Sequence, residues 1–242
     1  MELKKINSSQ ALSWYAEGWR LFAKDPGLWV LVTFSFIAIN VAMTLVPLFG
    51  QVAIAVLTPA FYGGLLHGAR ESLQGGKLHF KHLFSVLMDP DRRGPMLMLG
   101  VLALGAQAIM LGIAMVLGFP ELLVIAPGQM PALNLSGGAM LVLLVVLTFG
   151  ALMSMALLYA VPLVFFDRLD PLAAVKSSFG ACWRNIGPLT LAGLIYLGLA
   201  ALASLVFFLG FLILIPVTLG AVYASYRAIF EPSPPSDFIV IE

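Results

Sequence analysis

Four long uncharged stretches restrict what this chain can fold into. They run over residues 26–69, 94–120, 122–166 and 185–226, and all 13 Lys and Arg residues lie in the short segments outside them. Hydrophobic residues make up 61% of the chain and charged residues only 10%, against about 25% charged in a typical soluble domain. This pattern predicts an all-α integral membrane protein.

The lengths of these stretches predict how they divide into helices. About 20 apolar residues cross a hydrocarbon core of about 30 Å, so 26–69 and 185–226 are each long enough to fold back as a hairpin. The other two stretches give one crossing each, joined by an outer loop over 119–137. The predicted result is three hairpins with transmembrane helices at 28–48, 51–69, 96–118, 139–166, 188–208 and 210–229.

The basic residues predict the orientation. With six crossings every Lys and Arg faces one side, and the positive-inside rule makes that side the cytoplasm. Both termini are therefore predicted to be cytoplasmic. Five or seven crossings would move some of these charges outside. The single cysteine, Cys182, excludes an intramolecular disulfide.

Each hairpin is preceded by an amphipathic stretch that is typical of a helix lying on the membrane surface. The predicted surface helices span 8–25, 78–89 and 171–186. In the first helix, the apolar residues that recur at helical spacing are Leu12, Tyr15, Trp19 and Phe22, and Trp14 and Leu21 widen this stripe. The preferred interpretation is a helix that docks the first span, and the alternative is a site for a lipid headgroup or a partner protein.

One motif occurs twice, at the ends of the first and third hairpins. Residues 59–70 and 216–227 both begin with proline, contain glycine and end with arginine at the same spacing. The first and third hairpins are therefore predicted to form a parallel internal repeat. Residues 1–230 are predicted to be a single membrane domain and 231–242 a disordered tail.

Small residues in the two copies predict close helix contacts, because they let helix backbones approach each other. The clearest example is the pair Gly64 and Gly68. The predicted packing residues are Gly63, Gly64, Gly68, Gly220, Ala221 and Ala224. The same faces would also permit a homo-oligomer.

Polar groups and helix breakers inside the predicted spans are the candidates for ligand binding. A hydrogen bond to a neighbouring helix is the preferred interpretation for Asn40, and a helix-interface role for His67. Arg70 and Arg227 suit either snorkelling anchors or contacts to lipid headgroups. The candidate ligand-binding residues are Asn40, Pro59, His67, Arg70, Pro216 and Arg227.

The sequence lacks the common catalytic motifs. It contains no GxSxG, HExxH or CxxC motif and no phosphate-binding loop, and no carboxylate lies within a predicted span. The missing carboxylates disfavour a proton- or ion-coupled transporter. His79 and His82 have no further ligand at motif spacing, so neither a metal site nor a cofactor is predicted. The chain is predicted not to be an enzyme.

Three short segments carry a resemblance to a known family. They are Ala160–Val164, Pro171–Phe179 followed by Asn185, and Val222–Arg227. Together they resemble a family of uncharacterised six-helix inner-membrane proteins of proteobacteria, similar in layout to the membrane domain of some glycerophosphodiester phosphodiesterases. The resemblance implies a bacterial inner membrane and a six-helix bundle. It implies no substrate, and no catalytic domain is expected here.

Two functions of different classes fit these observations. The first is a non-enzymatic scaffold, regulator or assembly partner of a membrane complex, with a protein partner at the cytoplasmic surface helices or the C-terminal tail. The alternative is a carrier for a lipid or small apolar molecule, with a site between the first and third hairpins. Membrane lipids are expected partners in both cases, and nucleic acid in neither.

Overall fold

The computed structural model describes residues 4–117, 137–206 and 208–230, and within these ranges the regular elements are all helices. Their order along the chain is α1 (Gln10–Lys24), α2 (Pro26–Thr44), α3 (Phe49–Leu73), η1 (Phe80–Phe84), α4 (Ser85–Met88), α5 (Pro90–Val116), α7 (Gly137–Leu157), α8 (Ala160–Asp167), α9 (Pro171–Arg184), α10 (Ile186–Leu205) and α11 (Phe211–Phe230). The predicted outer loop and tail lie largely or wholly outside the described residues.

Six candidate membrane spans are present, as predicted: α2, α3, α5, α7 continued by α8, α10 and α11 are long and apolar enough to cross a bilayer. The largest difference in bounds is at α5, which begins at Pro90 instead of residue 96. The Asp89 carboxylate accepts hydrogen bonds from the backbone N–H groups of Asp91 and Arg92, and proline suits a first helical turn. This N-cap starts the helix early.

The predicted span 139–166 is interrupted where α7 gives way to α8. Pro162 lacks the N–H that would bond back to residue 158. One turn earlier, the Ser178 hydroxyl of α9 accepts from the Tyr159 N–H at 3.0 Å and donates to the Met155 carbonyl at 2.7 Å. This hydroxyl replaces the helical bond between those two groups, and a side chain inserted into the ladder in this way is a known cause of helix bending.

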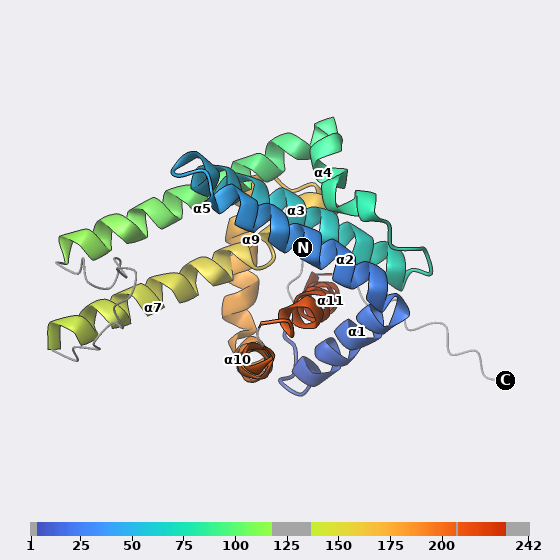
Figure 1. The fold of residues 1–242 in the computed structure, drawn as a ribbon. Coiled ribbons are helices and arrows are strands. Elements are labelled where there is room, and N and C mark those ends of the chain that lie inside the picture. Colours follow the sequence, from blue (N-terminus) through green and yellow to red (C-terminus); the bar gives the residue numbers. More distant parts are fainter. Residues whose placement is uncertain (1–3, 118–136, 207, 231–242) are drawn as a thin grey trace.

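Helix α11 lies at the centre of the molecule, and α1 crosses it (Figure 1). A Cβ added to Gly220 would lie 2.6 Å from the Gly18 Cα, so the two backbones are in direct contact. Of the predicted apolar stripe of α1, Trp14, Leu21 and Phe22 are buried, whereas Leu12 and Trp19 are 64% and 55% exposed and are free to contact lipid. The helix turns its small residue inward, and the buried face consists of Ala11, Trp14, Gly18, Leu21 and Phe22.

The predicted surface helix over 78–89 is two short pieces, η1 and α4, that pack on α3. The carbonyl of His82 lies against Gly64, and a Cβ on Gly68 would come within 2.6 Å of the Leu78 side chain. Leu83 is fully buried. The Gly64 and Gly68 face thus receives this connecting segment in place of a membrane helix.

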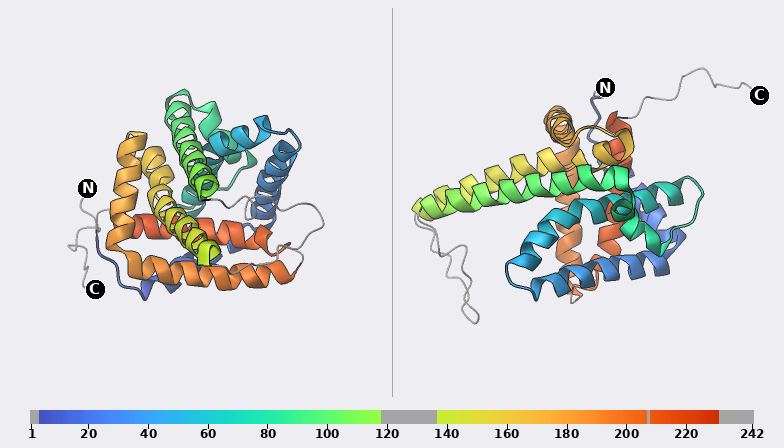
Figure 2. Two further views of the ribbon diagram at one scale, coloured as in Figure 1. Left: turned by 90° about the vertical axis from the view of Figure 1, so that its left-hand side faces the viewer. Right: turned by 90° about the horizontal axis from the view of Figure 1, so that it is seen from above.

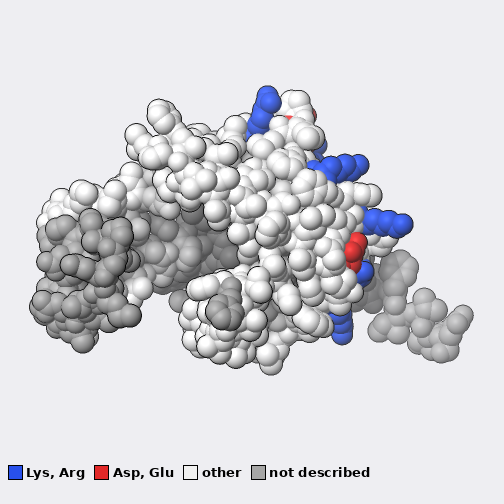
Figure 3. All heavy atoms as spheres, viewed as in Figure 1, with Lys and Arg blue, Asp and Glu red and all other residues white. Residues whose placement is uncertain are grey.

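The candidate spans do not form a parallel bundle. Helices α5 and α7 project together as an arm, whereas α10 and α11 run across the direction of that arm (Figure 2). On the face shown in Figure 3, the Lys and Arg side chains gather at the end opposite the arm. The spans thus diverge from a charged base, unlike the simple bundle that the family resemblance implies.

Candidate functional site

A cavity of about 810 Å³ lies between α7 on one side and α10 and α11 on the other, with side chains of α1 and α9 completing its wall. Most of the wall is aliphatic or aromatic, and representative lining residues are Trp14, Met155, Leu158, Leu189, Leu194 and Leu197. Small-molecule sites typically occupy about 300–1,000 Å³ and are mostly apolar. The size and lining of this cavity suit an apolar ligand.

Three hydroxyl groups in the wall are bonded to the protein. The Tyr15 hydroxyl donates to the Ala192 carbonyl at 2.9 Å, and burial raises its pKa to about 12. The Ser154 and Ser225 hydroxyls each donate to a carbonyl of their own helix at 2.8 Å. The Thr218 hydroxyl differs, because it is buried and has no hydrogen-bond partner among the described residues. Its oxygen has almost no accessible surface, so the hydroxyls of the wall that a ligand could reach are those of the exposed residues Thr190 and Tyr196.

Cys182 lines the same cavity from α9. It is 1% exposed, and burial raises the pKa of its thiol to about 12, opposed in part by a hydrogen bond with Ser178. The thiolate is the nucleophilic form of cysteine. Cys182 therefore remains protonated near neutral pH and serves as a small apolar wall residue.

The candidate ligand-binding residues do not line this cavity. The Asn40 amide donates to the Phe36 carbonyl of its own helix at 2.8 Å, not to another helix. Pro59 is half-buried within α3, and Pro216 is buried within α11. The structure therefore does not bring Asn40, Pro59 and Pro216 together in one site.

Both arginines of the repeated motif stack on aromatic rings. The Arg70 guanidinium lies 5.0 Å from the centre of the Phe166 ring. The Arg227 guanidinium lies 5.4 Å from the Tyr223 ring and pairs with the Glu17 carboxylate of α1 at 2.5 Å. Arg227 thus joins α11 to α1.

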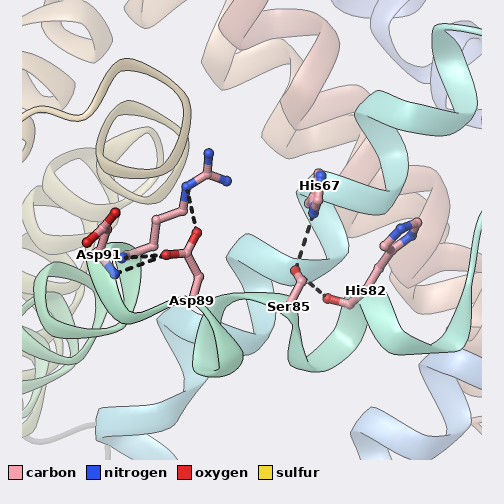
Figure 4. Close-up of polar contacts among 6 residues, drawn as sticks. His67, His82, Ser85, Asp89 and Asp91 are labelled. Carbon is pink, nitrogen blue, oxygen red and sulfur yellow. Dashed lines mark hydrogen bonds and ion pairs between the residues drawn. The ribbon is translucent and has the colours of Figure 1, made fainter.

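His67 lies in a polar cluster at the base (Figure 4), where its Nδ1 is 3.3 Å from the Ser85 hydroxyl. That hydroxyl donates to the His82 carbonyl at 2.9 Å, and it accepts from His67 when Nδ1 carries the proton. His82 Nε2 lies 2.7 Å from a Glu71 carboxylate oxygen. The cluster fastens η1 and α4 to α3. Within the described ranges, no group of His, Cys, Asp and Glu could hold a metal ion.

The predicted packing residues are buried on α3 and α11: Gly63, Gly64, Gly68, Gly220, Ala221 and Ala224. Ala221 also lines the cavity. Sequence reasoning missed the partner of Gly220, which is Gly18, and it missed Ser178 and Thr218. Thr218 lies inside the repeated motif, so a search for hydroxyls between its proline and arginine would have found it.

Comparison with known proteins supports the membrane assignment. The chain is 26% identical over 266 aligned positions to a probable inner membrane protein of Burkholderia thailandensis, with 97% of each chain covered. The protein is a multi-pass inner-membrane protein. No protein-family model matches this inner-membrane chain, and no solved structure matches it.

Proposed function

We propose that this protein is a non-enzymatic inner-membrane protein that binds a lipid or another long apolar molecule in the cavity between α7 and the α10–α11 pair. The observation that carries the proposal is the cavity itself, about 810 Å³ in volume and lined mainly by apolar side chains. Its site lies beside α7, not between the first and third hairpins. The carrier hypothesis is thereby moved to a different pair of elements.

The chemistry of the wall favours an amphiphile. Most lining side chains are apolar, and the exposed residues Thr190 and Tyr196 add hydroxyl groups to the same wall. A ligand with a carbonyl oxygen, such as the ester of an acyl chain, would accept a hydrogen bond from one of these hydroxyls. A pure hydrocarbon would make no such bond and is the poorer ligand.

Tryptophan fluorescence tests whether an acyl chain occupies the cavity. Trp14 lines it, whereas Trp29 is fully buried away from it. Variants that keep only Trp14 or only Trp29, with the other three tryptophans changed to Phe, would be placed in vesicles of phospholipids with brominated chains. We expect strong quenching of Trp14 and little quenching of Trp29. Equal quenching of the two would contradict the proposal.

The scaffold role is the second candidate. It is supported by the two surface helices, where Trp19 of α1 and Trp183 of α9 are 55% and 61% exposed. Such residues could contact a partner protein as well as lipid. Gentle extraction followed by native mass spectrometry distinguishes the candidates, since the carrier retains lipid and the scaffold retains a stoichiometric protein.

The membrane layout is part of the proposal. We propose three hairpins with both termini in the cytoplasm and a repeat that relates the first to the third. Two features support the repeat: α3 and α11 each carry a proline in mid-helix and an arginine near the exit. We also propose that the layout is similar to that of the membrane domain of some glycerophosphodiester phosphodiesterases, and we propose no enzymatic activity.

A further inference from the structure

The turns between α2 and α3 and between α10 and α11 are unusually apolar for exposed turns. Leu48 and Phe49 are 73% and 77% exposed, and Phe208 and Leu209 are 68% and 61% exposed. Turns in water favour Gly, Pro, Asn, Asp and Ser. Of that set these turns contain Pro47, Gly50 and Gly210, and they add exposed Leu and Phe side chains. Contiguous exposed apolar groups indicate contact with something other than water.

The backbone conformation strengthens this point. Leu48 has φ of 63° and Phe208 has φ of 61°, the left-handed region that bulky residues rarely adopt. Glycine would relieve the strain at either position, yet a large apolar side chain is kept. Such outliers are maintained where the side chain has a role. The matching positions in the two turns point to the same role.

Several backbone donors in each turn are bonded within the turn. In the first turn the N–H groups of Phe49, Gly50 and Val52 donate to carbonyls two to four residues earlier, and in the second turn those of Leu209, Phe211 and Leu212 donate to carbonyls three residues earlier. Hydrocarbon offers no water for unbonded backbone groups. The N–H groups of Leu48 and Gln51 make no such bond among the described residues, so the turns meet this requirement in part.

The turn of the α2–α3 pair lies well short of the far end of α5. Helices α3 and α5 touch where Gly100 faces the backbone of Val56. Beyond that point α5 continues to Val116, about 24 Å at about 1.5 Å per residue, whereas α3 reaches its first residue, Phe49, in about 10 Å. The difference of about 14 Å is close to half of a hydrocarbon core of about 30 Å.

The α10–α11 pair also reaches less far into the bilayer than α5 and α7, because of its tilt. It runs across the direction of α5 and α7 (Figure 2). When α5 and α7 stand along the bilayer normal, α10 and α11 are therefore strongly tilted. Helix α10 has 20 residues, about 30 Å in length, which only just spans the core when upright. Any large tilt leaves its turn inside the bilayer.

We propose that the α2–α3 and α10–α11 pairs enter the membrane from the cytoplasmic side and turn back within its hydrocarbon, so that α5 and the α7–α8 segment alone cross it. The basic residues are equally compatible with six crossings, because a hairpin starts and ends on the same side in both cases. The inference is independent of the cavity. Its occupant is the hydrocarbon of the bilayer.

Cysteine accessibility tests this arrangement in the full chain in membranes. In a Cys182→Ala background, Leu45→Cys and Leu209→Cys place single thiols at exposed turn positions without positive φ. Glu121→Cys, between α5 and α7, is the control for the outer side. Gln74→Cys, exposed at the end of α3, is the control for the cytoplasmic side. A membrane-impermeant maleimide is added to spheroplasts, and again after detergent solubilisation.

The expected result is labelling of the Glu121→Cys variant from outside and labelling of the two turn variants only after solubilisation. A nitroxide on the turn thiols should then collide more with oxygen, which is concentrated in hydrocarbon, than with a water-soluble nickel chelate. Labelling of either turn variant from outside at the rate of the Glu121→Cys variant overturns the proposal for that hairpin. Dominant nickel collisions would do the same.

Discussion

Helices α7 and α11 show that the most apolar helix of this protein is not the most buried. The α7 span is the more hydrophobic of the two, yet only 11% of its apolar window is buried, compared with 61% for α11. The lipid-facing helix carries aliphatic residues, whereas the central helix carries Gly220, Ala221, Ser225 and two tyrosines. In lipid, helices associate through close packing and hydrogen bonds, not through hydrophobicity. The helix whose small residues allow close packing is therefore the buried one, and the more hydrophobic helix faces lipid.

The largest test of this comparison is at the crossing of α1 and α11. Gly220→Leu would drive a side chain into the Gly18 backbone, which cannot yield, and we expect a loss of about 3 kcal/mol or more. Gly150→Leu on α7 meets open space and should leave stability nearly unchanged. Thermal unfolding in detergent, followed by size-exclusion chromatography, measures both. Equal melting temperatures would refute the assigned contact.

A smaller loss is expected at the break between α7 and α8. Ser178→Ala removes the hydroxyl that satisfies the Tyr159 N–H and the Met155 carbonyl, and leaving buried groups unbonded costs about 1–3 kcal/mol. The neighbouring Ser177→Ala is the matched control. Chemical denaturation of both variants gives the free energy difference. Similar stabilities would mean that another group satisfies the two backbone atoms.

Acid should lower the stability of the charged end of the molecule, where η1 and α4 pack on α3, and should leave the arm of α5 and α7 unaffected. Burial lowers the pKa of His82 below its usual value of about 6.5, with Glu71 opposing the shift. A lowered folded-state pKa means that protonation favours unfolding, so stability is present above about pH 6.5 and is lost as pH falls toward the folded pKa. His82→Gln should flatten this dependence between pH 7.5 and 5.5, whereas the exposed His79→Gln should not. Hydrogen exchange in α7, which has no ionisable group, should stay constant.

The smallest effect is expected from the ion pair between α1 and α11. Glu17 and Arg227 are each more than one-third exposed, and exposed pairs contribute about 0.2–1 kcal/mol. Glu17→Gln should therefore lower the melting temperature much less than Gly220→Leu, although both changes affect the same crossing. A comparable loss in the two variants would show that charge, not backbone contact, holds α1 in place.

The sequence could predict the helices but not how they meet. Long uncharged stretches set the six candidate spans, because bilayer thickness fixes helix length. The crossing of α1 and α11 could not be predicted, because Gly18 contributes nothing to an apolar pattern although it lies where the two backbones meet. The cavity arises from the angle between α7 and α10, and helical periodicity carries no information on that angle. The role of Ser178 could not be predicted, because its hydrogen-bond partners are backbone atoms of another part of the chain.

The Ser178 hydroxyl also sets the heading of the arm. It must donate one hydrogen bond, to the Met155 carbonyl, and accept another, from the Tyr159 N–H. Sliding α9 by one turn would present Ala174 or Cys182 there, and neither side chain can do both tasks well. One side-chain oxygen of α9 thus ties the register of α9 to the point where α7 gives way to α8.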